Sequence, residues 1–245
     1  MTSPDDLYAV RINQADPRLG RQIVHDPRSR RFAAAPRTTT AKRQNRSHRI
    51  WDPHPNPNQV IGNCTGVAEC VMGNSAGNRH KGVTLDMQDA VRIYSLATSL
   101  DPFDGAYPPE DTGSSGLAAA KAAVQLGIGD RYEWYFGIDA VLDGLQDHTL
   151  SVGTWWYWDM FNATSQNRLV RPTGGKAGGH QWALYKHDVS VSKLSIGKQR
   201  VGGICWWGSY RYFELTVDDF AELLADDGDV HRTIRANTPL TKGHL

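Results

Sequence analysis

The sequence of 245 residues has little cysteine and no long hydrophobic run. Its three cysteines, Cys64, Cys70 and Cys205, are an odd number without CxxC spacing, which argues against a disulfide framework and against a four-ligand zinc site. No run approaches the roughly 18 apolar residues that a membrane-spanning helix needs. The first residues lack the basic region and the apolar core of a secretory signal. We therefore expect a cytoplasmic protein without a cofactor, whose thiols are buried or reactive.

The charge is unevenly distributed along the chain. The formal net charge is only +1, but residues 17–50 hold ten Lys or Arg against one acid, Asp26, so this segment carries +9 and the remainder −8. Such a segment either binds nucleic acid through phosphate contacts or packs on the acidic remainder of its own protein. We favour the second interpretation, so nucleic acid is an unlikely partner, and no membrane partner is indicated.

The composition divides the chain into three parts. Residues 1–50 are rich in Arg, Pro, Thr and Asn and have little apolar periodicity, which predicts an extended arm or leader. Residues 51–235 form the predicted folded domain, and residues 236–245 form a tail. Three prolines in WDPHPNPN, residues 51–58, force an extended entry into that domain.

Within the domain, the pattern changes from helical to strand-like near residue 150. We expect helices over 64–72, 84–98 with Thr84 as N-cap, 117–126, 138–145 and 216–225. Aromatic and β-branched runs predict strands over 151–158, 180–187 and 210–217, and the chain after the last helix is expected to fray. This is an α+β arrangement, in which a helical N-terminal half packs against a C-terminal antiparallel β half, with the active site between them.

Cys64 is the first candidate for chemistry, because it stands where the first helix begins. A helix N-terminus stabilises a thiolate through the macrodipole and the unpaired N–H groups. Gly62 and Asn63 before it, with Thr65 after it, predict a tight turn in which the backbone N–H of Cys64 faces an oxyanion. A cysteine at a helix start is more often a packed small residue, so this position alone does not identify a nucleophile.

A nucleophilic thiol needs a base, and His180 is the best candidate. It follows Gly178 and Gly179 on a predicted strand, where the glycines let a substrate backbone approach the imidazole. His187 lies seven residues further along the same strand, so it points to the opposite face and is the weaker candidate.

The motifs GNCTGVAEC (62–70) and GGH (178–180) together resemble the papain family of clan CA cysteine peptidases, especially its phage and bacterial members. The resemblance covers residues 50–230 and implies a papain-like fold and peptide-bond hydrolysis through an acyl-thioester on Cys64. It also implies that the segment DTGSSGLAAAKAAVQLG (111–127) lines the substrate cleft, with protein or peptide substrates and possible phage structural proteins as partners. The cleft residues so implied are Gly113, Ser114, Ser115, Gly116 and Gly179.

The chain departs from the family pattern at the oxyanion donor and after the nucleophile. The family has a Gln six residues before its cysteine, whereas this chain has Asn58 there and Gln59 one position nearer. Either amide is a candidate donor. Thr65 replaces the usual Trp that follows the nucleophile.

The third catalytic residue is also not evident. The family has an Asn in an NSWG motif, followed by a second WG. Aligning Trp207-Gly208 with the second WG places Val201 at the Asn, and an ungapped match to NSWG places Cys205 there. Neither side chain orients an imidazole as an amide oxygen does, and Gln199 is a possible substitute.

Two rival functions remain open. The missing Asn favours a catalytically silent papain-like domain that serves as a structural or binding component of a virion. A peptidoglycan-directed endopeptidase of a related family is the second rival. The run Trp155, Trp156, Tyr157 and Trp158 is expected to alternate between the core and the cleft wall of a strand. In the peptidase interpretation, the basic arm is a leader that occupies the cleft until it is cleaved between residues 17 and 50.

Overall fold

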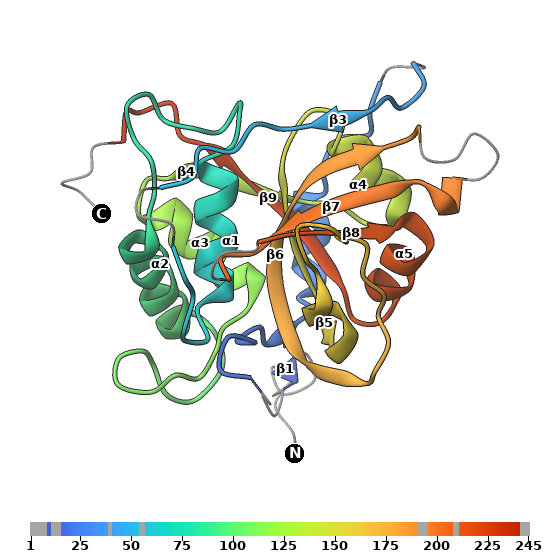
Figure 1. Ribbon diagram of the computed structural model, residues 1–245. Helices are drawn as coiled ribbons and strands as arrows, with labels where there is room; N and C mark the ends of the chain where they lie inside the picture. Colours follow the sequence, from blue (N-terminus) through green and yellow to red (C-terminus); the bar gives the residue numbers. More distant parts are fainter. Residues whose placement is uncertain are drawn as a thin grey trace.

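A computed structural model describes residues 9–10, 16–38, 41–53, 57–190, 196–207 and 211–240. Figure 1 shows helices on one side of the molecule and a twisted sheet on the other, with the N-terminal residues lying where the two halves meet. The end of the predicted tail, 241–245, and Gly208 of the predicted second WG lie outside the described residues. None of the helices in the described ranges is long and apolar enough to cross a membrane.

The helical half contains α1 (Cys64–Gly73), α2 (Met87–Leu100) and α3 (Gly116–Gln125). Helix α1 passes very close to α2, because a Cβ at Gly66 would lie 2.1 Å from the carbonyl oxygen of Ala90. Helix α2 begins three residues later than predicted. Its N-cap is Asp86, which forms a capping box with Asp89, so the choice of Thr84 was wrong.

Within the described residues, seven strands form one antiparallel sheet, so the α+β prediction is confirmed. Its order is β4-β9-β5-β6-β7-β8, and β3 pairs with β6. The strands are β3 (Arg46–Ser47), β4 (Gly129–Trp134), β5 (Leu150–Tyr157), β6 (Lys176–Asp188), β7 (Arg200–Ile204), β8 (Tyr212–Thr216) and β9 (Asp229–Arg235). Two further helices, α4 (Ile138–Gly144) and α5 (Val217–Ala225), cover the sheet.

Four strands of this sheet were absent from the prediction, the two-residue β3 and the longer β4, β7 and β9. Strand β4 carries three charged residues, β7 contains two glycines, and β9 has only two apolar residues among charged and polar ones. The expectation that the chain frays after the last helix was wrong, because β9 lies in the sheet between β4 and β5.

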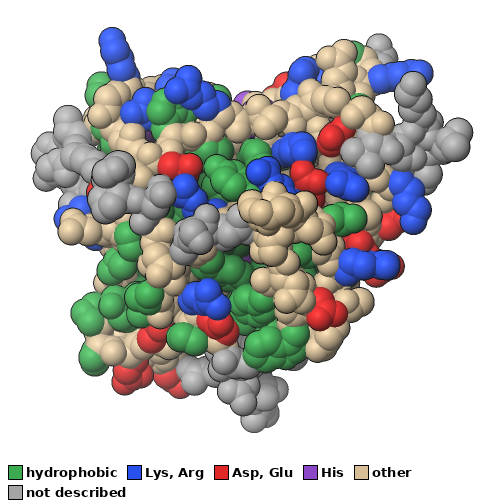
Figure 2. Space-filling view, in the orientation of Figure 1, with side chains coloured by type: hydrophobic (Ala, Val, Ile, Leu, Met, Phe, Trp, Pro, Cys, Tyr) green, Lys and Arg blue, Asp and Glu red, His purple; other side chains and the backbone are tan. Residues whose placement is uncertain are grey.

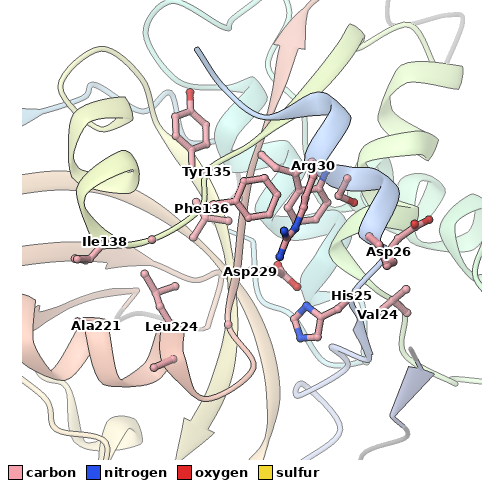
Figure 3. A pocket seen from close by; sticks show the side chains of 17 residues that line it. Val24, His25, Asp26, Arg30, Tyr135, Phe136, Ile138, Ala221, Leu224 and Asp229 are labelled. Carbon is pink, nitrogen blue, oxygen red and sulfur yellow. The ribbon is translucent and has the colours of Figure 1, made fainter. Parts of the chain in front are cut away.

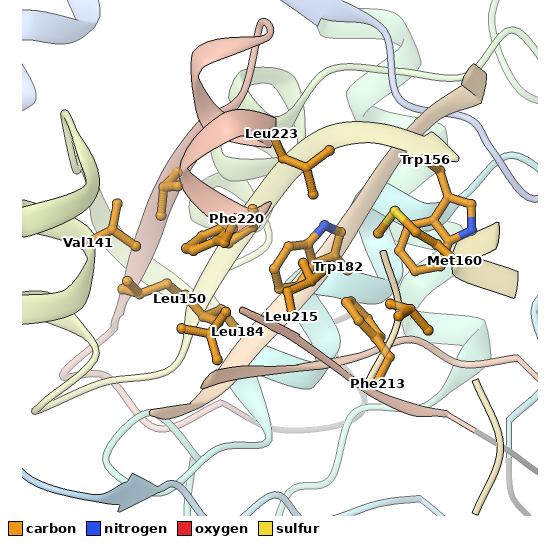
Figure 4. Packing of buried hydrophobic residues seen from close by; sticks show 14 of the residues in the cluster. Val141, Leu150, Trp156, Met160, Trp182, Leu184, Phe213, Leu215, Phe220 and Leu223 are labelled. Carbon is orange, nitrogen blue, oxygen red and sulfur yellow. The ribbon is translucent and has the colours of Figure 1, made fainter. Parts of the chain in front are cut away.

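Strand β6 separates two hydrophobic cores. Trp182 and Leu184 point into a core between the sheet and α4 and α5, shown in Figure 4, whereas Ala183 and Tyr185 point into a core shared with α1, α2 and α3. Successive side chains of a strand point to opposite faces, so β6 is buried on both sides. This burial fixes the position of His180, which lies on the same strand.

The basic arm lies on the body of the protein. It contributes β2 (Ile23–Val24), which pairs with β1 (Ala9–Val10), the 3-10 helix η2 (Pro27–Phe32) and β3. Several of its arginines pair with acids of the body, as the charge asymmetry predicted. These pairs are Arg21–Asp229, Arg37–Asp147, Arg43–Asp139 and Arg43–Asp143. On the face shown in Figure 2, basic and acidic side chains are interspersed rather than gathered into one basic patch.

A buried carboxylate–imidazole pair joins α1 to the sheet. The carboxylate of Glu69 lies 2.6 Å from Nε2 of His231 on β9, and both side chains have no exposed surface. A buried pair of this kind is costly to break, because the remaining partner is left without compensation in a low-dielectric interior. The pair therefore holds α1, and Cys64 at its start, against β9.

We predict that Glu69→Ala lowers the free energy of unfolding by about 3 kcal/mol, since it leaves His231 unpaired in the core. Denaturant unfolding followed by circular dichroism measures this change. Glu222→Ala, an exposed glutamate on α5, is the matched control and should change stability by less than about 0.5 kcal/mol. Equal losses in the two variants would contradict a role for the pair.

Candidate active site

Cys64 is the first residue of α1 and has no exposed surface. Backbone N–H groups of Gln181, Gly20 and Thr65 favour its thiolate and so oppose the effect of burial on its pKa. Asn63 is the N-cap but makes no capping hydrogen bond with its side chain. The sulfur therefore lies at the free N-terminus of a helix, where N–H dipoles favour a negative charge.

The basic arm covers this sulfur by pairing with both walls of the cleft. The N–H of Arg21 donates to the carbonyl of Gly179 at 3.1 Å, and the N–H of Ser114 donates to the carbonyl of Gly20 at 2.8 Å. Gln22 then donates to the carbonyl of Ser114 at 2.8 Å. Gly179 belongs to β6 and Ser114 precedes α3, so the arm bridges the β half and the helical half as an extended peptide.

Only glycine fits at position 20. A Cβ there would lie 1.8 Å from the carbonyl oxygen of Gly62, two residues before Cys64. The arm thus passes in direct contact with the turn that precedes the thiol.

His180 lies on β6 with its ring almost fully buried. Its Nε2 is 3.2 Å from Sγ of Cys205, and its Nδ1 is buried without a hydrogen-bond partner. The described contacts include no hydrogen bond between His180 and Cys64. The backbone N–H of the next residue, Gln181, favours the thiolate of Cys64, so β6 carries both His180 and a group that acts on the Cys64 sulfur.

Aromatic rings fix the imidazole. The ring of Trp156 packs edge-on against His180 with centroids 4.9 Å apart, and Trp207 packs on it at 4.5 Å. Of the aromatic run on β5, Trp156 is therefore the core residue, while Trp158 is exposed.

Burial under the arm keeps both groups uncharged. It raises the pKa of Cys64 to about 11, against the opposing effects of the N–H groups of Gln181 and Gly20 and of the Arg21 charge. It lowers the pKa of His180 to about 3, and the nearby Arg18 charge lowers it further. At neutral pH the resting site therefore holds a thiol and a neutral imidazole rather than an ion pair.

The sulfur of Cys205 contacts the imidazole of His180. Of the two alignments considered above, the ungapped one agrees with the contact between Cys205 and His180, since Val201 is a core residue opposite His187. The suggestion that Gln199 substitutes for the Asn was wrong. Its side chain bonds Nε2 of His187 at 3.0 Å instead.

Of the two candidate oxyanion donors, Gln59 lies in the cleft. Its buried amide donates to the carbonyls of Arg18 and Ile61, both at 2.9 Å, and accepts from the indole N–H of Trp207 at 3.2 Å. Asn58 is exposed at the surface. The amide of Gln59 therefore already holds a peptide carbonyl, that of the arm.

Of the predicted cleft residues, Gly113, Ser114, Ser115 and Gly116 lie together on the helical wall, whereas Gly179 lies on β6. Ser114 bonds the arm through its backbone and Asp101 through its hydroxyl at 2.6 Å, and Ser115 caps α3. The N–H of Gly113 donates to the hydroxyl oxygen of Tyr94 at 2.9 Å, and Gly116 packs against Gln181. In the described ranges, no three His, Cys, Asp or Glu side chains are arranged to hold a metal ion.

Comparison with known proteins shows the fold. No family model and no curated protein matches the chain. Among solved structures, xylellain, a cysteine protease from Xylella fastidiosa, superposes with a TM-score of 0.60 at 16% identity over 90% of this chain and 98% of its own. The ragweed pollen cysteine protease Amb a 11 in its proform gives 0.56 at 9% identity, covering 82% of this chain and 69% of that one. Procathepsin B S9 from Trypanosoma congolense gives 0.53 at 11% identity, covering 75% and 73%. The fold is papain-like, as the GNCTG and GGH motifs predicted.

We predict that unseating the arm activates the thiol. Gly20→Val in the full-length chain should lower the pKa of Cys64 from about 11, because solvent then reaches the sulfur. A fall of two pKa units raises the thiolate fraction at neutral pH roughly a hundredfold. The pH dependence of the iodoacetamide rate at Cys64, followed by mass spectrometry, measures it.

Ala35→Val is the matched control, because it adds similar bulk at an exposed position of the arm. Its Cys64 should react as slowly as that of the unmodified chain. The arm would not be what protects the thiol if Gly20→Val also reacted at the unmodified rate.

Proposed function

We propose that the chain is a cysteine peptidase that its own arm holds in a latent state. The observation that supports this most directly is an extended peptide bound between the two walls of the cleft, in contact with Cys64 and bonded to Gly179 beside His180. The cleft thus accommodates a peptide backbone across a thiol at a helix N-terminus. This is the arrangement that peptide-bond hydrolysis by a thiol requires.

In the proposed reaction, the Cys64 thiol gives its proton to Nδ1 of His180, which is the ring nitrogen without a hydrogen bond. The sulfur attacks the carbonyl carbon of the scissile bond. The imidazolium returns the proton to the leaving amine as the C–N bond breaks, which leaves an acyl-thioester. Water then attacks the thioester with His180 as base, and the products are a carboxylic acid and the free thiol.

Gln59 and the backbone N–H of Cys64 are the proposed donors to the oxyanion. The Gln59 amide donates to the carbonyl oxygen of Arg18 in the resting chain, so it already binds a peptide carbonyl of the arm. Preorganised donors of this kind stabilise the charge that develops on the oxygen.

Cys205 is the proposed positioning residue for His180. A thiol is a weak hydrogen-bond donor and acceptor, so it restrains the imidazole less firmly than an amide oxygen would. We therefore expect a functional but slow peptidase rather than an inactive one.

The arm accounts for latency without any further component. Its backbone hydrogen bonds to Gly179 and Ser114 occupy the positions at which the two walls would bind a substrate backbone. It therefore blocks access to Cys64, which has no exposed surface. Displacement of the arm, or its cleavage between residues 17 and 50, is the proposed route to activity.

A catalytically silent domain is the second candidate, supported by the thiol of Cys205 in place of an amide and by the complete burial of Cys64. The phage origin, the virion role, the cytoplasmic location and a peptidoglycan substrate all stay predictions from the sequence. Digestion of purified cell wall, set beside digestion of an unfolded protein, separates the peptidoglycan-directed activity from the protein-directed one.

Turnover of an unfolded protein substrate by the full-length Gly20→Val chain tests the proposal. Cys64→Ala in that background should abolish turnover, because it removes the nucleophile. Cys205→Asn should raise kcat and Cys205→Ala should lower it, each by roughly tenfold, because an oriented base contributes more to the rate than a loosely held one.

Cys70→Ala is the control for loss of a buried thiol, since Cys70 lies on α1 away from His180. If the Cys205→Asn variant is as stable to denaturant as the unmodified chain and still shows no turnover, the result would favour the silent domain. Turnover that survives Cys64→Ala would rule out Cys64 as the nucleophile.

A further inference from the structure

Asp111 connects the nucleophile turn, residues 61–63, to the helical half of the protein. Its carboxylate accepts the backbone N–H of Gly62, at 2.9 Å for Oδ2 and 3.2 Å for Oδ1. The same Oδ1 accepts the hydroxyl of Tyr94 on α2 at 2.5 Å. The Tyr94 hydroxyl oxygen in turn accepts the N–H of Gly113 at 2.9 Å. One carboxylate thus joins the nucleophile turn, α2 and the loop that leads into α3.

The groups that bond in this network are buried, although Asp111 itself is exposed. Tyr94 has no exposed surface, and Gly62 is buried as well. Burial raises the pKa of the Tyr94 phenol, and its hydrogen bond to Asp111 raises it further, so the hydroxyl remains a donor at neutral pH. Loss of the carboxylate would leave the N–H of Gly62 and the hydroxyl of Tyr94 without this acceptor, which is costly for buried groups.

Close packing of α1 against α2 keeps Tyr94 in place. A Cβ at Gly66 would lie 2.1 Å from the carbonyl oxygen of Ala90 and 3.2 Å from the backbone nitrogen of Tyr94, so the two helices cannot move closer together. The ring of Tyr94 also packs on Tyr107, with centroids 5.2 Å apart. A phenol fixed in this way holds the carboxylate of Asp111, which in turn holds the nucleophile turn.

The nucleophile turn carries both proposed oxyanion donors. The backbone N–H of Cys64 directly follows the turn, and the side-chain amide of Gln59 donates to the carbonyl of Ile61 at 2.9 Å. A displacement of Gly62 therefore moves both donors relative to a bound carbonyl. Oxyanion stabilisation depends on donors that already lie within hydrogen-bond distance of the developing charge, so it is sensitive to such a displacement.

The arm also supports the turn, but only while it is seated. A Cβ at Gly62 would lie 2.7 Å from Oδ1 of Asp111 and 3.3 Å from the Cα of Gly20, so the carboxylate and the arm both touch this residue. The packing of the arm on the body is incomplete, because a cavity of about 610 Å³ lies between residues 24–30 and the body (Figure 3). Once the arm is displaced, the contact with Gly20 is lost and the contact with Asp111 remains.

We propose that Asp111 is a positioning residue of the candidate active site, which keeps the nucleophile turn and its two oxyanion donors in place after the arm has left. The inference rests on the proposed peptidase function and adds a residue that acts through the turn and does not touch the substrate. Asp111 acts on the turnover of bound substrate, so its loss lowers kcat and leaves KM nearly unchanged.

Kinetics in the full-length Gly20→Val chain test this role. Asp111→Ala should lower kcat for a peptide substrate roughly tenfold or more and change KM by less than about twofold, because it displaces the oxyanion donors. Asp111→Asn retains an oxygen acceptor for Gly62 and should recover most of that loss. Glu110→Ala removes an exposed carboxylate of the same loop, is the matched control and should leave both constants within about twofold. A loss confined to KM, or equal losses in Asp111→Ala and Glu110→Ala, would overturn the assignment.

A peptide aldehyde distinguishes the oxyanion donors from the reactivity of the thiol. The Cys64 sulfur bonds to the aldehyde carbon while the thiol proton passes to the carbonyl oxygen, which then lies at the proposed oxyanion site. Iodoacetamide alkylates the same sulfur, with loss of iodide and the thiol proton, and does not use these donors. Asp111→Ala should weaken aldehyde binding roughly tenfold and leave the iodoacetamide rate within about twofold. Equal effects on the two reagents would overturn the assignment.

Hydrogen exchange keeps the test independent of turnover. In the same chain, Asp111→Ala should speed amide exchange in residues 59–66 roughly tenfold, and Glu110→Ala should not change it. Unchanged exchange in Asp111→Ala would overturn the assignment, even if Cys64-dependent cleavage supports the peptidase. Faster exchange, in a chain whose Cys64 reacts with neither substrate nor aldehyde, would support the anchoring of the turn and count against the proposed function.

Discussion

The backbone pairing of Gly20, Arg21 and Gln22 with Gly179 and Ser114 is the interaction on which the resting state depends. These three hydrogen bonds connect the helical and the β halves across the cleft. They bury the Cys64 sulfur completely and shield the His180 ring. The high pKa of the thiol and the low pKa of the imidazole both follow from this burial. The proposed latency is thus an electrostatic consequence of how the arm is seated.

The two side chains that flank Gly20 hold the arm in register. Leu19 belongs to the hydrophobic core beneath the sheet, whereas Arg21 pairs with Asp229 on the other side. Gly20 itself must lack a side chain, because it contacts Gly62. A register shift by one residue would place a charged or bulky group over the thiol, so the segment Leu19–Arg21 fits the cleft in one way only.

Much of the fold was predictable from local sequence patterns, and the failures have physical causes. The helix starting at Cys64 and the strand carrying His180 follow from local periodicity and from the glycines around them. Strands β4, β7 and β9 were missed, because charged residues or glycines obscure the alternation that marks a strand. Their strand conformation depends on neighbours that are distant in the sequence.

The site residues that the sequence did not identify also depend on neighbours that are distant in the sequence. The sequence left Gln59 and Asn58 as equal candidates, and only the folded chain shows which amide faces the arm. The sequence allowed two alignments, which placed either Val201 or Cys205 at the position of the missing Asn. Only the pairing of β7 with β6 shows that Cys205 contacts His180 and that Val201 lies opposite His187. The partnership of Arg21 and Asp229 spans 208 residues and has no local signature, although the excess of charge in the arm indicated that such pairs exist.

The most direct test of the account is to identify which thiol forms a covalent bond with a peptide. A peptidyl vinyl sulfone is incubated with the full-length Gly20→Val chain, and the adduct is mapped by mass spectrometry. The account predicts one adduct per chain, located on Cys64 and lost in the His180→Ala variant. An adduct on Cys205, or equal slow labelling of all three cysteines with no dependence on His180, would contradict it.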